Sequence, residues 1–423
     1  MCALFWARGA ERYLAPSGRL AFVLPYAVLN APVYAGLRRG QMLLAQVRLT
    51  GAWALERVWP IFGAQSGSST TSTCVLFGQR AEAGSPPAMV DRWVGRLPRR
   101  DADDAEATQA LLHSRVAWPR ERTLIGVSPY RARFRQGATL VPRRFFIVDP
   151  APVSRLGVRR DVPRMQGRAG KLDKAPWTTV EPPVGPIEAR FLRPIVLGET
   201  IVPFRLLEPV HGVIPMVGTT LLDSAAAQAE GFENLARWLR DIETKWEAHS
   251  NRGLDGKARM SLNERINHMR TLSGQAGEVP NRVVYTASGT RLSAARVMSS
   301  DAIVEHKAYW AAARTAEEAS YLVAVLNSAA VLAKITDLQP HGQRDKRDFD
   351  NLVWTLPIPE YDPADPVHRD LAAAAARAER VVGGLDLTGL GHFTAQRRAI
   401  RVALETEGVA AEIETLVDAL LPP

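Results

Sequence analysis

The stretch Arg19–Leu24 (RLAFVL), which is stopped by Pro25, decides the predicted fold. A short, continuous apolar run is typical of a strand buried in a parallel sheet. Met1–Leu14 and Val33–Leu44 have the spacing of helices, and Thr73–Phe77 (TCVLF) is a second buried strand. We expect the two apolar runs to be neighbours in one sheet. The order of these elements predicts an α/β fold with part of a doubly wound, Rossmann-like sheet.

The rest of the chain is expected to be a mixed α+β region followed by helices. Leu140–Val148, Arg193–Ile201 and Asn351–Pro359 have strand-like composition, and Glu317–Lys334 is predicted to be an amphipathic helix. Residues 81–123 are polar and contain Gly84-Ser85-Pro86-Pro87, which favours a linker with a short helix. The expected domains are therefore a sheet domain over 1–80, a linker over 81–123, an α+β domain over 124–370 and a helical tail over 371–423.

Composition excludes several classes of protein. With 423 residues, 46% hydrophobic and 23% charged, the chain can bury a large core, which excludes disordered, collagen-like and disulfide-stapled proteins. It contains two cysteines, Cys2 and Cys74, and neither a CxxC pair nor an HExxH motif, so no metal site is expected. The apolar runs are too short to span a bilayer, and charges interrupt the first residues, which predicts a cytoplasmic protein.

Positive charge is concentrated in one stretch. Gly126–Lys174 holds twelve Lys and Arg against three acids, 12 − 3 = +9, which equals the formal net charge of the whole chain. Such a stripe indicates a polyanionic partner such as nucleic acid. Arg outnumbers Lys 46 to 7 in the chain, however, which a GC-rich genome alone would produce. Charge therefore leaves both interpretations open.

Three segments carry a resemblance to a known family. Tyr13–Gly40 (YLAPSGRLAFVLPYAVLNAPVYAGLRRG) resembles the part of amino-group DNA methyltransferases that follows their catalytic motif. Ser320–Ala372, with LNS at Leu326–Ser328 and LPIP at Leu356–Pro359, is similar to the target-recognition region of bacterial restriction–modification adenine methylases. Gln136–Asp149 (QGATLVPRRFFIVD) resembles another piece of that region. The resemblance implies methyl transfer from S-adenosylmethionine to the adenine amino nitrogen, with double-stranded DNA as partner.

The chain departs from that family at the motifs that bind the cofactor and catalyse. It has neither an FxGxG-type turn nor a [DNS]PP[YFW] motif. Two Pro-Pro pairs lie in Ser85–Ala88 and Glu181–Val184, where no aromatic residue follows, and the third is Pro422-Pro423. The chain thus resembles the downstream part of such an enzyme, truncated or split. Two explanations stay open: the gene model starts late or is frameshifted, or a separate polypeptide supplies the first half. The alternative is a non-catalytic DNA-binding specificity module.

The resemblance also indicates candidate residues around the flipped base. An aromatic residue is expected before the loop that leads to the last strand, which singles out Phe62, then Trp59, for base stacking. Both could instead fill the end of the sheet. Pro25, Tyr26 and Asn30 follow a strand, so they are expected at the edge of a cofactor or base pocket, because ligands of open α/β sheets bind beyond the carboxyl ends of strands. Asn30 could equally be a helix N-cap.

The DNA-binding candidates are basic and amide side chains. Arg131, Arg133 and Arg135 alternate, so on a strand they would share one face, and Arg143 and Arg144 follow shortly after. A polar loop between a helix and a strand supplies four more candidates: Gln343, Arg344, Lys346 and Arg347. Acids alternate with bases in that loop, so an internally paired turn is the competing interpretation.

Overall fold

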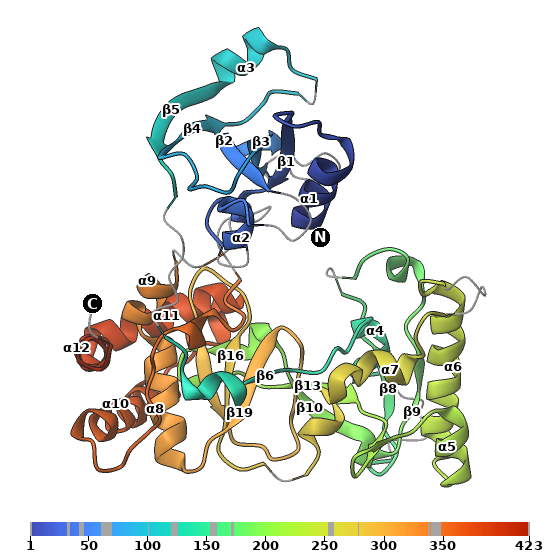
Figure 1. Ribbon diagram of the computed structural model, residues 1–423. Helices are drawn as coiled ribbons and strands as arrows, with labels where there is room; N and C mark the ends of the chain where they lie inside the picture. Colours follow the sequence, from blue (N-terminus) through green and yellow to red (C-terminus); the bar gives the residue numbers. More distant parts are fainter. Residues whose placement is uncertain are drawn as a thin grey trace. The chain divides into compact units, whose positions relative to one another are not determined.

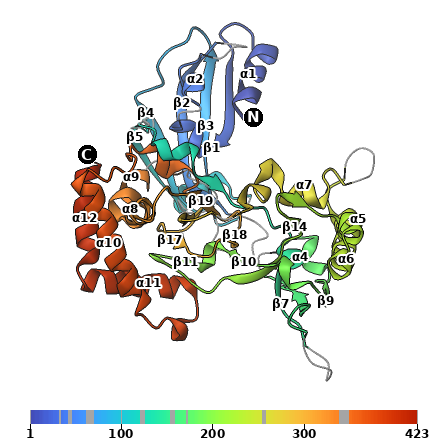
Figure 2. The ribbon, with the colours of Figure 1, turned by 90° about the horizontal axis from the view of Figure 1, so that it is seen from below.

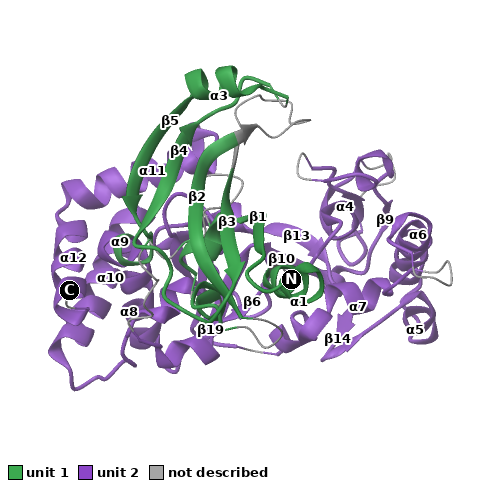
Figure 3. Cartoon of the chain, turned by 45° about the horizontal axis from the view of Figure 1, so that its top comes forward, with its two compact units in different colours: residues 1–125, 333–348 green, residues 126–332, 349–423 purple. Residues whose placement is uncertain are grey.

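The computed structural model describes residues 2–31, 34–41, 46–60, 70–99, 101–119, 126–152, 159–170, 173–252, 258–277, 279–336, 339 and 348–421. The chain divides into two compact units, which Figure 3 colours separately. Unit 1 comprises residues 1–125 and 333–348, and unit 2 comprises residues 126–332 and 349–423. Each unit has its own hydrophobic core.

Unit 1 begins with a helix and continues as a largely β structure (Figure 1). Its elements are α1 (Cys2–Tyr13), β1 (Arg19–Pro25), η1 (Tyr26–Leu29), α2 (Ala35–Arg38), β2 (Val47–Pro60), β3 (Thr70–Arg80), β4 (Met89–Gly95), α3 (Asp104–Ala110) and β5 (Leu111–Ala117), where η denotes a 3-10 helix. The first predicted helix is confirmed by α1, and the second predicted buried strand lies inside β3.

β3 is the strand that holds the sheet of unit 1 together. The five strands described in this unit are ordered β1-β3-β2-β4-β5. β3 pairs antiparallel with both β1 and β2, so β1 and β2 run parallel to each other on either side of it. β4 pairs parallel with β2, and β5 pairs antiparallel with β4. The expectation that Arg19–Leu24 and Thr73–Phe77 are neighbours is confirmed, with Leu24 opposite Cys74.

One face of this sheet is covered and carries the core of unit 1. Alternate residues of the strands, among them Leu24, Cys74 and Leu76, pack with Trp6 of α1 and with residues of η1 and α2. Trp6 is fully buried, and its ring meets Phe22 edge-on at 5.6 Å. The alternation follows from the two-residue period of a strand, which directs successive side chains to opposite faces.

Two expectations for unit 1 are wrong. β1 is not a buried parallel strand: it is the outermost described strand, its partner β3 is antiparallel, and Val23 is 62% exposed. Residues 81–123 are not a linker with only a short helix. They contain β4 and β5 as well as α3, and Val90 of β4 belongs to the core of unit 1. The polar character of this stretch reflects strands whose second face is solvated, as antiparallel sheet edges permit.

Gly78 provides a test of the packing between α1 and the sheet. A Cβ added there would lie 2.6 Å from Trp6 Cζ2 and 2.7 Å from Val47 Cγ1. We expect Gly78→Ala to lower the free energy of unfolding by about 1–3 kcal/mol in urea denaturation, since overpacking displaces buried side chains. Gly51→Ala is the matched control, because its Cβ would meet Phe77 Cδ2 at an ordinary 3.6 Å. Equal losses in the two variants would contradict this packing.

Unit 2 contains short strands between two groups of helices. Its first half consists of η3 (Pro129–Ala132), β6 (Arg135–Gln136), α4 (Arg143–Phe146), β7 (Ile147–Pro150), β8 (Arg164–Gly167), η4 (Trp177–Thr179), β9 (Val184–Pro186), η5 (Ala189–Phe191), β10 (Leu192–Val196), η6 (Gly198–Thr200), β11 (Ile201–Val202), β12 (Arg205–Leu206), β13 (Val210–Val213), β14 (Met216–Val217), β15 (Thr220–Leu221), α5 (Ser224–Ala229) and α6 (Glu233–His249).

The second half of unit 2 is richer in helix. It consists of α7 (Leu262–Ile266), η7 (His268–Arg270), η8 (Ser273–Gln275), β16 (Arg282–Thr286), β17 (Ala294–Val297), β18 (Ile303–Val304), β19 (Ala308–Ala312), α8 (Ala316–Asn327), α9 (Ala329–Thr336), η9 (Leu352–Thr355), α10 (Pro366–Gly383), η10 (Thr388–Leu390), α11 (Phe393–Thr406) and α12 (Val409–Leu420). Helix α9 crosses the boundary between the units.

Two main sheets form the centre of unit 2. Among the described residues, one sheet has the order β18-β10-β13-β7-β8-β9 and another has the order β17-β16-β19-β6. In Figures 1 and 2, α5 and α6 lie at one end of the unit, and α8, α10, α11 and α12 lie at the other, with the strands between. The six-stranded sheet and α6 share one core, in which Phe145, Trp238 and Ile242 are buried.

Several expectations for unit 2 need correction. Asn351–Pro359 is not a strand but contains the 3-10 helix η9, and Leu140–Val148 contains the helix α4 before β7. Glu317–Lys334 is not one amphipathic helix: it is broken at Ser328, and α8 is buried on nearly all sides. Residues 371–423 form the expected helical C-terminal tail, and α10 within it packs against α8.

Within the described part of the chain, no single helix is both long and apolar enough to cross a membrane. By length and composition alone, α8 and α9 together would suffice, but they meet at a bend of 56°.

Candidate functional site

The carboxyl ends of β1 and β2 lie at the same edge of the sheet of unit 1. Pro25 is the last residue of β1, and both Pro25 and Leu55 stand opposite Thr73 of β3. Tyr26 directly follows as the first residue of η1, and its side chain is buried. Beyond Leu55, β2 contains a bulge in which Arg57 has a φ of 59°, and bulges of this kind redirect neighbouring side chains.

Three polar side chains meet at this edge. The Tyr26 hydroxyl donates a hydrogen bond of 2.9 Å to Glu56 Oε1, and Arg92 of β4 donates to both oxygens of the same carboxylate, at 2.9 and 2.6 Å. Burial and the adjacent Glu56 carboxylate raise the pKa of the Tyr26 hydroxyl well above its ordinary value. The tyrosine therefore stays protonated and remains a donor, and the bidentate Arg92–Glu56 pair fixes the position of the carboxylate.

Asn30 lies at the other end of η1 from Tyr26. It is the C-terminal cap of that 3-10 helix, so the expected role as a helix N-cap is wrong. The residue is only 9% exposed, and its Oδ1 has no hydrogen-bond partner among the described residues. A buried acceptor without a donor is costly, which makes this oxygen a candidate contact for a group bound at the edge.

The two base-stacking candidates lie at the end of β2 or beyond it. Trp59 belongs to β2 and pairs with Thr71, but its side chain lies outside the described part of the structure. Phe62 lies outside the described residues altogether. The stacking role of both therefore stays a prediction.

A row of aromatic side chains, which the sequence analysis missed, lies on the second face of the same sheet. Trp53 of β2 is 43% exposed and meets Phe77 at 5.1 Å and Trp93 at 6.4 Å between ring centroids. Trp93 in turn lies 4.3 Å from the ring of His113. Alternate positions in GAWALERVW and MVDRWVG were the available signal. Such a row offers flat apolar surfaces on which planar rings can stack.

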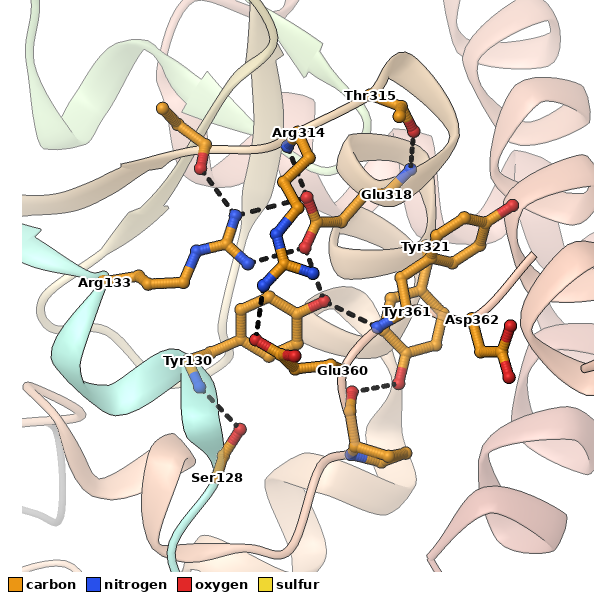
Figure 4. A network of polar contacts seen from close by, with 12 residues as sticks. Ser128, Tyr130, Arg133, Arg314, Thr315, Glu318, Tyr321, Glu360, Tyr361 and Asp362 are labelled. Atoms are coloured by element: carbon orange, nitrogen blue, oxygen red, sulfur yellow. Dashed lines mark hydrogen bonds and ion pairs between the residues drawn. The ribbon is translucent and has the colours of Figure 1, made fainter. Parts of the chain in front are cut away.

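Arg133 does not contribute to a strand face. Arg131 and Arg133 lie in and just after the 3-10 helix η3, and only Arg135 lies on a strand, so the expected alternation on one strand is wrong. Figure 4 shows the Arg133 guanidinium directed at Glu318, to which it donates at 2.6 and 3.2 Å. Tyr130 donates to the same carboxylate at 2.9 Å, and Glu318 is 1% exposed. This network joins η3 to the start of α8.

Arg143 and Arg144 are also engaged inside unit 2. The pair lies in α4, where Arg143 contacts Glu199 at 3.1 Å and Glu305 at 3.3 Å. Arg144 is 5% exposed, pairs with Asp173 at 2.9 Å and donates to the Val180 carbonyl. These two arginines are therefore held by the fold in the structure.

Arg131 and Arg135 remain on the surface. Both are exposed, and neither makes an ion pair with an acid among the described residues. The Arg135 guanidinium lies beside η8, 4.0 Å from the position that a Cβ on Gly274 would take. The four candidates of the polar loop, Gln343, Arg344, Lys346 and Arg347, lie outside the described residues.

Comparisons with known proteins give weak similarities of structure. No family model matches the chain, and neither does any curated protein. The fold is similar to the Type IIL restriction–modification enzyme MmeI in complex with DNA, with a TM-score of 0.49 and 11% identity, over 99% of this chain and 48% of that one. It is also similar to the type IIG restriction endonuclease BpuSI, with a TM-score of 0.29 and 12% identity, over 99% of this chain and 49% of that one. The chain thus spans about half the length of these proteins.

The carboxyl edge of the sheet does not make a complete site for S-adenosylmethionine. Glu56 accepts two hydrogen bonds from Arg92 and one from Tyr26, so most of the acceptor capacity of this carboxylate is used within the fold. No glycine-rich turn follows a strand of unit 1 within the described residues. The described part of the chain also contains no group of three His, Cys, Asp or Glu side chains that could hold a metal ion.

The Arg133–Glu318 pair predicts how stability depends on pH. Burial alone would raise the pKa of Glu318, but hydrogen bonds from Arg133, from the Arg314 backbone and from Tyr130 lower it below the ordinary 4.5. The pair therefore stabilises the fold above about pH 4.5, and this contribution is lost as the pH falls through the lowered value. We expect Arg133→Ala to lower the free energy of unfolding at pH 7 by about 3 kcal/mol, because it leaves a buried carboxylate unpaired.

Urea denaturation of the wild type and the variant between pH 7 and pH 3 measures this difference, which should shrink below pH 4.5. Arg159→Ala is the control, since its pair with Asp161 is exposed and screened by solvent, so the variant should change stability little at either pH. A difference that does not change with pH would refute the assigned role of Glu318.

Proposed function

We propose that this chain is the DNA-binding, downstream part of a site-specific DNA adenine methyltransferase from a restriction–modification or phage-defence system. The observation that carries the proposal is the pairing of β1 with β3. The sequence predicts that both strands belong to one Rossmann-like sheet, and the segment that contains β1, Tyr13–Gly40, is one of those that resemble methyltransferases. The parallel course of β1 and β2, with their carboxyl ends at one edge, agrees with a ligand pocket at that edge.

In the complete enzyme, S-adenosylmethionine would supply an activated methyl group, and residues outside this chain would bind it. The residues of this chain would complete the edge of the pocket through Tyr26, Asn30 and the fixed Glu56–Arg92 pair. Aromatic side chains on or beside the sheet would stack on a base taken out of the duplex. Unit 2 would hold the duplex through exposed basic side chains.

Calorimetric titration with S-adenosylmethionine tests whether this chain binds the cofactor alone or only together with an upstream polypeptide. We expect no measurable binding by this chain alone, because the chain has no FxGxG-type motif and no glycine-rich turn follows a strand in the described part of unit 1. Binding is expected once a polypeptide with an FxGxG turn and a [DNS]PP[YFW] motif, encoded upstream, is added. Tight binding by this chain alone would refute the claim that the site is incomplete.

The engagement of Glu56 favours one rival, a DNA-binding specificity module without catalytic function. This rival predicts duplex binding and no cofactor binding in either titration. A mixture that binds cofactor and transfers a radioactive methyl group to adenine would exclude it.

The surface arginines predict the salt dependence of DNA binding. Each phosphate contact that is lost should reduce the slope of log K against log salt by about 0.9. We expect this reduction for Arg131→Ala and for Arg135→Ala, measured by fluorescence anisotropy on a 30-bp duplex at several salt concentrations. Arg398→Ala is the control, since Arg398 is an exposed arginine of α11 outside the basic stretch. Slopes that match those of the control would place both arginines away from DNA.

A further inference from the structure

The turn between α7 and η8 has an unusual backbone. Met269 and Arg270 have φ values of 53° and 60°, so two consecutive residues other than glycine occupy the left-handed region. A side chain with a Cβ is disfavoured there, and such residues persist only where the surroundings determine their conformation. They gather at binding sites, which makes this turn a place to look for one.

The surroundings hold this turn from both sides. Asn267 Oδ1 accepts a hydrogen bond of 2.9 Å from the Ser273 backbone, which closes the turn across its ends. Gln275, 2% exposed, donates through Nε2 to the Thr271 carbonyl at 2.9 Å and to the Val304 carbonyl at 3.0 Å. Its Oε1 accepts from the Val304 backbone at 2.8 Å, which ties the turn to β18. The turn is therefore a fixed feature of unit 2.

The turn presents an apolar side chain among polar ones. Met269 is 84% exposed, and His268 and Arg270 beside it are exposed as well. An open pocket of about 540 Å³ adjoins the turn, and Arg259, Asn263, Asn267, His268 and Met269 line it. Glu264 also lines the pocket, but its carboxylate accepts a hydrogen bond of 2.7 Å from the Ser261 backbone.

A second basic group lies near this turn. The Arg135 guanidinium lies beside Gly274 in η8, the short helix that follows the turn. Arg270 makes no ion pair among the described residues of the chain. Positive groups that are not neutralised by acids suit phosphate, and the amide of Asn263 belongs to the side-chain type that can donate to and accept from a base edge.

We propose that the His268–Arg270 turn is a DNA wedge, with Met269 inserted against the base stack and Arg270 and Arg135 on the flanking phosphates. The proposal rests on the proposed function of unit 2 as a duplex-binding unit. An unbranched, polarisable Met side chain suits insertion between base steps, as apolar wedges of DNA-bending proteins do. The fixed backbone means that the wedge is already in place before DNA arrives, which lowers the entropic cost of binding.

The test compares three variants of the full chain on two DNA probes. One probe is a random 30-bp duplex pool, and the other is the sequence that the wild-type chain enriches from that pool. Met269→Ala should weaken binding of the enriched sequence at least about fivefold and change binding of the random pool less than about twofold. Met298→Ala is the matched control, because Met298 is 81% exposed but has no left-handed backbone, and it should change neither.

Met269→Gly separates loss of the wedge from loss of the fold. Glycine accepts a φ of 53° without strain, so the melting temperature should be unchanged or higher while binding of the enriched sequence falls as for Met269→Ala. An enriched duplex with 2-aminopurine at each position in turn should fluoresce more strongly with the wild type than with Met269→Gly at one base step.

The outcomes separate this inference from the proposed function. A wild-type chain that binds no duplex would overturn the proposed function and the wedge with it. A wild-type chain that binds DNA, with Met269→Ala and Met269→Gly indistinguishable from Met298→Ala, would overturn the wedge alone.

Discussion

The structure of unit 1 depends on the two hydrogen-bond ladders of β3. Because this strand pairs antiparallel on both sides, it forces β1 and β2 to run parallel although they never touch. Their carboxyl ends then meet at one edge, where Tyr26, Glu56 and Arg92 converge from three separate elements. A shift of one residue in either ladder would turn Tyr26 or Glu56 to the opposite face. The candidate pocket edge is thus a consequence of strand register.

Buried ion pairs reduce the positive charge that the basic stretch Gly126–Lys174 can offer to a polyanionic partner. Glu318 and Asp173 are nearly inaccessible, and a buried carboxylate without a partner is strongly destabilising, so Arg133 and Arg144 are committed to the fold. Exposed Arg168 pairs with Asp149. Charge in the sequence therefore overstates the charge available to a polyanionic partner. The arginines relevant to the proposed DNA binding are those that pair with no acid among the described residues.

The sequence predicts those parts of the fold that local patterns determine. An apolar run and its proline locate β1, and helical spacing locates α1, because each signal lies within the segment itself. The direction of strand pairing cannot be predicted from a local pattern, because it depends on β3, which lies some fifty residues after β1. The same holds for Arg133, whose partner Glu318 is 185 residues away. The left-handed turn at Met269 has no glycine to mark it, so no residue pattern pointed to it.

The motif behind the resemblance of Ser320–Ala372 has a structural role in this chain. Asn327 of LNS exchanges hydrogen bonds of 2.9 and 3.0 Å with the backbone of Ala294, which fastens the end of α8 to β17. Ser328 breaks the helix, and its hydroxyl bonds to Glu414 of α12 at 2.7 Å. Both side chains therefore make their hydrogen bonds within unit 2 itself. The part of the resemblance carried by Asn327 and Ser328 therefore concerns how unit 2 is built, and under the proposed function the contacts that read a DNA sequence would come from other, exposed side chains.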